Sequence, residues 1–182
     1  MKILIVNNNL NIGGVQKSLV NLLGEIHSEH DVTLFLFSDS GELKKDIPEN
    51  VKIIEGNRFV RLMGITNAEA KSEGMITYLL RSFFTVLTRV FGTRVSFGIL
   101  SRMQRMSGEY DVAVSFMQNG AYRVFYGGCN EFVVNGVRAK NKVAFVHCDF
   151  LNYEGNNRYN RNFYSKFDKI ACVSEKIGRA HV

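Results

Sequence analysis

The sequence predicts an α/β domain with a Rossmann-like, doubly wound parallel sheet, and three observations support this prediction. Short, nearly continuous apolar runs recur along the chain, as in strands that are buried on both faces. Amphipathic segments with helical periodicity separate these runs, as in a parallel sheet covered by helices. A length of 182 residues, with 46% hydrophobic and 22% charged residues, suits one globular domain with its own core.

Six runs of four to six residues are predicted to be strands: Ile3–Val6, Val32–Phe37, Val51–Ile54, Asp111–Ser115, Lys142–Val146 and Lys169–Val173. The first connection contains a predicted helix over Val15–Ser28, whose leucines and Ile26 fall on one face. The second connection, Ser38–Asn50, is rich in turn residues. Neither an internal repeat nor a linker interrupts the pattern, so residues 1–176 are interpreted as a single domain.

The loop after the first strand predicts an anion site. Three asparagines are followed by Gly13 and Gly14, which begin the helix. The free N–H groups and the positive dipole end of a helix N-terminus attract phosphate, and glycine lets the backbone approach it closely. The loop lacks the third glycine of a dinucleotide fingerprint, and Gln16 stands where a P-loop requires glycine. The alternative is that the glycine pair only turns the chain into the helix.

Polar residues also follow other predicted strands. Gln118 and Asn119 come after the fourth strand, and His147 comes directly after the fifth. Ligands of open α/β sheets bind beyond the carboxyl ends of the strands, so these side chains are candidate site residues. A histidine in this position is either structural or catalytic, and both interpretations remain open for His147.

The segment over residues 74–108 interrupts the alternation of strands and helices. It has no acidic residue, and it contains five arginines: Arg81, Arg89, Arg94, Arg102 and Arg105. Most of the net charge of +6 therefore belongs to this segment. Its apolar residues recur at helical spacing, with Arg81 and Arg89 expected on the opposite face. Two interpretations remain open, a helix on an anionic membrane surface and a helix packed on the sheet with a solvated arginine face.

Several classes of protein do not fit the sequence. It contains neither a signal peptide core nor an apolar run long enough to span a membrane. Cys129, Cys148 and Cys172 lack metal-ligand spacing and are interpreted as small core residues of a reducing cytoplasm. No metal site is predicted. A nucleic-acid-binding protein is disfavoured, because no recognition motif accompanies the arginines.

The chain resembles the N-terminal half of glycosyltransferase family 4, a group of retaining enzymes with the GT-B fold of two facing Rossmann-like domains. The resemblance lies in the opening strand from Met1, in the element Ile12–Lys17, in Ala144–His147, and in the closing Phe167–Ser174. It implies transfer of a sugar from a nucleotide-sugar donor to a lipid-linked glycan acceptor, in the synthesis of capsule, lipopolysaccharide or exopolysaccharide.

The resemblance also implies roles for individual residues. Gly13 and Gly14 would face the donor diphosphate, Gln16 would lie on the acceptor side, and His147 would lie near the transferred sugar. Gln118 and Asn119 are assigned to acceptor binding mainly because they follow a strand. The five arginines would face the inner surface of the plasma membrane, so a cytoplasmic, peripherally associated protein is expected. No cofactor or metal is expected beyond the nucleotide-sugar substrate.

In this family a second domain supplies most of the donor site, including basic residues and a pair of glutamates. Those features are absent from these 182 residues, so the chain alone is expected to be inactive. Its last six residues, 177–182, match one translation of a common sequencing-library adapter and are interpreted as a non-native tail. The alternative for these residues is a natural helix start after Ser174.

Two alternatives to an enzyme half remain open. The first is a stand-alone module that binds a sugar phosphate or nucleotide, such as one subunit of a split enzyme. An epimerase with the GT-B fold is a further enzymatic alternative, because one fold serves more than one chemistry.

Overall fold

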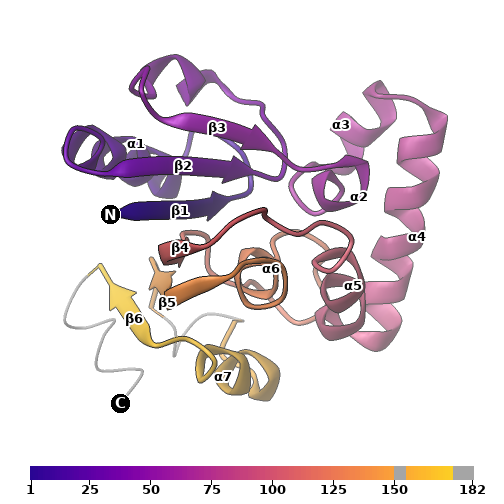
Figure 1. Ribbon diagram of the computed structural model, residues 1–182. Helices are drawn as coiled ribbons and strands as arrows, with labels where there is room; N and C mark the ends of the chain where they lie inside the picture. The colour runs from indigo at the N-terminus through magenta and orange to yellow at the C-terminus, as the bar shows by residue number, and fades with distance from the viewer. Residues whose placement is uncertain (150–154, 174–182) are drawn as a thin grey trace.

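A computed structural model describes residues 1–149 and 155–173. It contains one six-stranded sheet in which every strand is parallel to its neighbours, in the order β3-β2-β1-β4-β5-β6. The strands are β1 (Lys2–Asn7), β2 (Asp31–Leu36), β3 (Lys52–Glu55), β4 (Tyr110–Ser115), β5 (Ala139–Val146) and β6 (Lys169–Cys172). This order confirms the predicted doubly wound sheet, and all six predicted strands are present within a few residues of their expected bounds (Figure 1).

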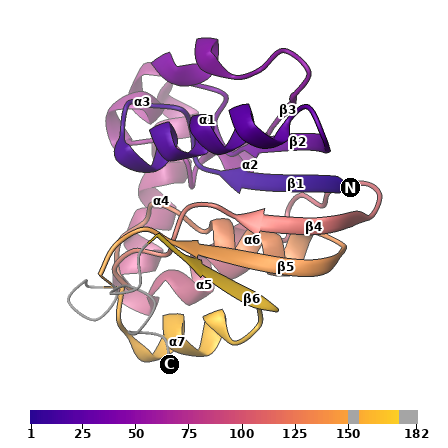
Figure 2. The ribbon, with the colours of Figure 1, turned by 90° about the vertical axis from the view of Figure 1, so that its left-hand side faces the viewer.

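The helices form two layers. One face of the sheet is covered by α1 (Gly14–Ile26) with the 3-10 turn η1 (Glu42–Asp46). The remaining helices belong to the other side: α2 (Arg58–Arg61), α3 (Asn67–Ser72), α4 (Met75–Phe91), α5 (Thr93–Leu100), α6 (Cys129–Gly136) and α7 (Arg158–Tyr164). Figures 1 and 2 show the strands between these layers.

Alternate residues of the central strands supply two separate cores. Leu4 and Val6 of β1 point to the core on the α6 side, whereas Ile3 and Ile5 point to the α1 side. This alternation follows from the period of two in a strand, and it explains why β1 is apolar throughout. On the α6 side, the rings of Phe35 in β2 and Phe132 in α6 stack with centroids 4.5 Å apart. This contact fixes α6 against the sheet.

Only part of the predicted apolar stripe of helix α4 packs inward: Phe84 is buried, and Leu80 and Leu87 are partly buried against the same core. Its apolar residues Ile76, Leu79, Phe83, Val86 and Val90 are exposed, whereas Arg81 and Thr88 are buried. Its main packing partners are α3 and α5, and it lies at the outer edge of the molecule beyond the carboxyl ends of β1–β3 (Figure 1). The helix is therefore amphipathic, but much of its apolar side faces outward.

The assignment of Arg81 to the membrane surface is wrong. Its side chain is only 5% exposed, and its guanidinium donates hydrogen bonds to the carbonyls of Ile65 and Phe125 at 2.8 and 3.1 Å. A third bond goes to the side chain of Asn67. The guanidinium also lies over the Phe125 ring, 5.3 Å from its centroid. Arg81 thus attaches α4 to the segments around α3 and α6, because its five donors can satisfy several carbonyls at once.

The basic segment forms two helices that are separated at Gly92. α4 ends at Gly92, which has a φ of 80°, and α5 begins at Thr93. Glycine is required there because a side chain would meet the Tyr122 ring and would strain the backbone. The expectations for Ser174 and for residues 177–182 lie outside the described residues. Within the described residues, no helix is long and apolar enough to cross a membrane.

Candidate functional site at the strand-order reversal

The sheet reverses its strand order between β1 and β4. Chain connections leave in opposite directions there, and open α/β sheets bind their ligands in the crevice expected beyond the carboxyl ends of such strands. The arrowheads of β1 and β4 point to the same side in Figure 2. A backbone hydrogen bond of 2.9 Å from Phe116 N to the Val6 carbonyl continues this pairing past the strand ends. The loops that follow the two strands therefore leave the sheet side by side.

The first loop delivers the N-terminus of α1 to this edge. Gly13 is the N-cap residue and Gly14 is the first helical residue, as expected. No side chain caps the helix, and no acidic residue lies in its first turn. A Cβ atom at Gly14 would meet nothing within 4 Å, so the space in front of this residue is open. The first N–H groups of α1 are available to an anion, as a phosphate-binding helix terminus requires.

Gln16 lies inside this turn. Its side chain is buried, and its Oε1 atom occupies the space that a Cβ at Gly13 would need, 2.5 Å from that position. Gln16 therefore packs against the turn that it follows in sequence. The assignment of Gly13 to the donor diphosphate and of Gln16 to the acceptor side stays a prediction.

The three asparagines of the loop hold the backbone in place. The Nδ2 atom of Asn9 donates to the Gly64 carbonyl at 2.9 Å and to the Tyr126 hydroxyl at 3.0 Å, and Asn7 donates to the Asn9 carbonyl. All three asparagines are buried. Asn7 Oδ1 and Asn8 Nδ2 have no hydrogen-bond partner among the described residues. The buried turn therefore contains one acceptor and one donor that are not satisfied within the described protein.

His147 lies at the same edge, beyond β5. Its Nε2 atom is 2.8 Å from the Phe116 carbonyl, so Nε2 carries the proton and Nδ1 is the acceptor of the neutral ring. Burial between the rings of Phe116 and Phe145 lowers the pKa of His147 by desolvation, and the hydrogen bond opposes this shift. The imidazole is therefore neutral at neutral pH and can accept a proton at Nδ1.

Gln118 connects the loops after β4 and β5. Its Oε1 atom accepts hydrogen bonds from the backbone N–H groups of His147 and Cys148 at 2.6 and 3.1 Å, and its Nε2 atom lies 2.6 Å from Cys148 Sγ. With these bonds Gln118 positions the backbone of His147. Its side chain is thus engaged within the protein, although it lies at the edge where the sequence placed it.

Asn119 points into the helical layer and away from the crevice. It is buried, and its Nδ2 atom donates to Glu131 at 2.9 Å and to Asn160 at 3.2 Å. The structure therefore gives Asn119 a position in a buried polar network with Glu131, Asn160 and Tyr159. The sequence offers no signal for this network, because its members come from three distant segments.

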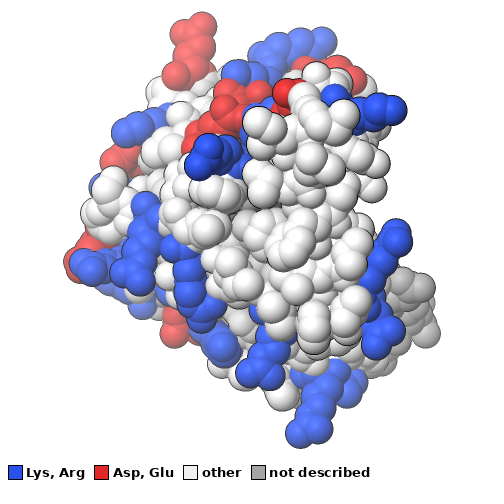
Figure 3. Space-filling model, turned by 90° about the vertical axis from the view of Figure 1, so that its right-hand side faces the viewer, with Lys and Arg blue, Asp and Glu red and all other residues white. Residues whose placement is uncertain are grey.

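The remaining arginines of the basic segment are exposed. Arg89 belongs to α4 and Arg94 to α5, and Arg102 and Arg105 follow in the next loop. Figure 3 shows basic side chains beside a wide surface without charged residues on the side where α4 lies. These four side chains are exposed, unlike that of Arg81, and their assignment to a membrane surface stays a prediction. Within the described residues, no group of His, Cys, Asp and Glu side chains is arranged to hold a metal ion.

Comparison of the chain with protein-family models, with curated proteins and with solved structures found no match. The described fold is an all-parallel, Rossmann-like α/β sheet flanked by helices.

Proposed function

We propose that the chain is the acceptor-binding half of a retaining glycosyltransferase, which transfers a sugar from a nucleotide-sugar donor to a lipid-linked glycan in surface polysaccharide synthesis. The observation that carries this proposal is the open, uncapped N-terminus of α1 at the strand-order reversal, on the same edge as a neutral histidine. The resemblance of the N-terminal strand, the glycine turn and the Ala144–His147 element to glycosyltransferase family 4 supports it.

In this proposal Gly13 and Gly14 stabilise the negative charge that develops on the leaving diphosphate. Backbone N–H groups are suited to this task, because they are fixed before the reaction and need no reorganisation. Gln16 and Gln118 line the acceptor side, and Gln118 holds the His147 backbone in position. Nδ1 of His147 is the atom that faces an acceptor hydroxyl or the transferred sugar. Donor contacts to the base and ribose belong to a second domain, as the resemblance implies.

The exposed side of α4 supports a membrane-bound acceptor. We define the apolar strip as Ile76, Leu79, Phe83, Val86 and Val90, which are between 58% and 77% exposed and repeat every three or four residues. A strip of this kind beside arginines is typical of helices that lie in a membrane interface. The nearby cations are attracted to anionic lipid by about 1 kcal/mol each. Because α4 lies on the side of the strand carboxyl ends, docking would bring the crevice to the inner membrane surface.

The proposal predicts that the isolated 182-residue chain transfers no sugar. The first experiment is to read the source DNA onward from the Lys176 codon and to express the chain that it encodes. A continuation with basic residues and paired glutamates, together with transfer from a nucleotide-sugar panel to membrane lipid extract, would support the proposal. A stop codon after Val182 would instead favour the binding module or the split enzyme.

A pair of variants at Gly14 tests the anion site directly. Gly14→Asp places a negative charge in the first turn, where it stabilises the helix by about 0.3–1 kcal/mol but repels a diphosphate. In the longer chain that the source DNA is expected to encode, this variant should abolish transfer and nucleoside diphosphate binding without loss of thermal stability. Gly14→Ala is the matched control, because its Cβ has open space and its backbone conformation suits any residue. Equal activity of the two variants would contradict the assigned role of the α1 N-terminus.

A further inference from the structure

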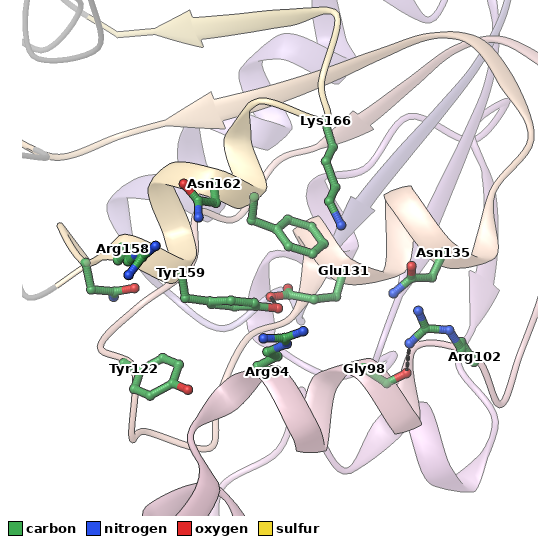
Figure 4. A pocket seen from close by; sticks show the side chains of 12 residues that line it. Arg94, Gly98, Arg102, Tyr122, Glu131, Asn135, Arg158, Tyr159, Asn162 and Lys166 are labelled. Atoms are coloured by element: carbon green, nitrogen blue, oxygen red, sulfur yellow. Dashed lines mark hydrogen bonds between the residues drawn. The ribbon is translucent and has the colours of Figure 1, made fainter.

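A cationic groove lies on the helical layer, away from the crevice at the strand edge. It has a volume of about 720 Å³. Helix α6 forms its floor, and α5 and α7 form its walls (Figure 4). Four basic side chains line it: Arg94, Arg102, Arg158 and Lys166. The groove is therefore a second concave surface, built from segments that are distant in the sequence.

Among the residues that the structure describes, the four cations of the groove form no close ion pair. The acidic residue that interacts electrostatically with one of them, Lys166, is Glu131 in the groove itself. Arg102 donates to the Gly98 carbonyl of α5, and Lys166 Nζ lies 4.6 Å from the centroid of the Phe163 ring. Arg94 belongs to α5 and Arg102 follows the C-terminal end of this helix, and both side chains line the groove. Such a set of converging, unpaired cations is suited to a phosphate group.

The floor of the groove carries a buried carboxyl group. Glu131 is fully buried, and its Oε1 atom accepts hydrogen bonds from Asn119 and from the Tyr159 hydroxyl, each at 2.9 Å. Its Oε2 atom has no hydrogen-bond partner among the described residues. The side chains of Arg94 and Lys166 extend toward this carboxyl group from opposite walls (Figure 4). An unpartnered buried oxygen is uncommon, and a hydroxyl group of a ligand would satisfy it.

The rest of the lining suits a hydroxylated ligand. The rings of Tyr122 and Tyr159 line the groove with their centroids 5.8 Å apart and offer faces against which C–H groups pack. Asn135 uses its Nδ2 atom to bind Ser101 Oγ, which leaves its Oδ1 atom for a donor. Asn162 is an exposed amide on the α7 wall. The amide, carboxyl and aromatic groups suit the hydroxyl and C–H groups of a sugar, and the neighbouring cations suit its phosphate.

We propose that this groove binds the phosphate ester of a polyhydroxylated group, as in a sugar phosphate. Arg94 and Lys166 bind the phosphate, and Glu131 with Asn135 binds the hydroxyl groups. The ligand is either a free sugar phosphate or the headgroup of a membrane lipid, because Val95 and Ile99 are exposed on the adjacent face of α5. The site is separate from the α1 N-terminus and does not depend on sugar transfer there.

The test uses the 182-residue chain with Gly14→Asp, so that the α1 N-terminus does not contribute. Glucose 1-phosphate is titrated by calorimetry, with glucose and inorganic phosphate as comparison ligands. We expect saturable binding of glucose 1-phosphate that is tighter than binding of either comparison ligand. The double variant Arg94→Ala/Lys166→Ala should weaken it by about tenfold or more, since it removes two charge-assisted contacts.

The matched control is Arg138→Ala/Lys169→Ala, which removes two exposed cations outside the groove. It should leave the affinity within about twofold. Circular dichroism and thermal unfolding check that all variants fold. Both targeted cations are exposed, so the double variant should remain stable.

A second arm identifies the source of the phosphate. The same variants are mixed with phosphatidylcholine vesicles that contain phosphatidylglycerol, which has a phosphate ester and free hydroxyl groups. Loss of vesicle binding only in the groove variant, without glucose 1-phosphate binding, assigns the site to a lipid headgroup. Groove-dependent glucose 1-phosphate binding assigns it to a soluble ligand. The inference is overturned if neither probe binds, or if the groove variant and the control behave alike in both arms.

Discussion

The buried position of Arg81 makes a strong prediction about stability. Arg81→Ala removes hydrogen bonds to the carbonyls of Ile65 and Phe125 and to the side chain of Asn67. A hydrogen bond to a charged group contributes about 1.5–3 kcal/mol, and the two carbonyls would be left buried without donors. Burial also lowers the pKa of Arg81, because the charged guanidinium is desolvated. Removing the guanidinium removes this desolvation cost, which offsets part of the loss in the free energy of unfolding.

The net loss in the free energy of unfolding is about 3–5 kcal/mol, since two bonds to buried carbonyls outweigh the recovered desolvation. At about 2–4 °C per kcal/mol for a domain of this size, the melting temperature should fall by about 6–20 °C. The assay is thermal unfolding followed by circular dichroism, with urea unfolding to obtain the free energy.

Arg89→Ala is the matched control, because Arg89 is an exposed arginine in the same helix. Its effect should stay within about 0.5 kcal/mol. If α4 instead exposed Arg81 as it exposes Arg89, the two variants would be equally stable. That result would refute the orientation of α4 described above, and with it the exposed apolar strip.

The remaining predictions concern the membrane surface and the histidine. Leu79→Asp/Val86→Asp should reduce binding to phosphatidylglycerol vesicles by about tenfold or more and leave the melting temperature nearly unchanged, because both side chains are exposed. Val173→Asp places a single negative charge on an exposed apolar residue after β6, and this variant should bind vesicles normally. Co-sedimentation compares the three proteins. For His147, the folded-state pKa lies below the ordinary value of 6.5, so the unfolded chain binds the proton more readily. The stability due to neutral His147 is present above pH 6.5 and is lost as pH falls through the folded-state pKa. His147→Gln should therefore lose less stability than the wild-type chain between about pH 7.5 and about pH 5.5, and equal losses in thermal unfolding would contradict the described environment.

Much of the fold and part of the site could be predicted from residue patterns. β1 is recognisable because Ile3–Val6 is apolar at every position, as a strand covered on both faces must be. The start of α1 is recognisable because Gly13 and Gly14 interrupt the polar loop just before a helical repeat. Strands that run parallel bring their following loops to one edge, so His147 and the glycine turn could be placed at the same edge without coordinates.

The orientation of α4 could not be predicted in this way. Periodicity shows that a helix has an apolar side, but it does not show whether the core, a membrane or another molecule covers that side. Here the carbonyls of Ile65 and Phe125 need donors, and Arg81 provides them, so the side with the arginine packs inward. Gln118 was correctly placed at the ligand edge, but only the structure shows that its side chain is used to hold the loop after β5.

The sequence by itself determined the class of fold, the order of its elements and the glycine turn at the first strand, because these depend on local periodicity and local backbone freedom. Tertiary structure alone decided which face of α4 is exposed, where Asn119 points, and that Arg94, Glu131 and Lys166 share one groove. Those properties depend on contacts between segments far apart in the chain. These contacts form where a buried polar group meets a hydrogen-bond partner from another segment. A short pattern of residues does not show which segments will meet.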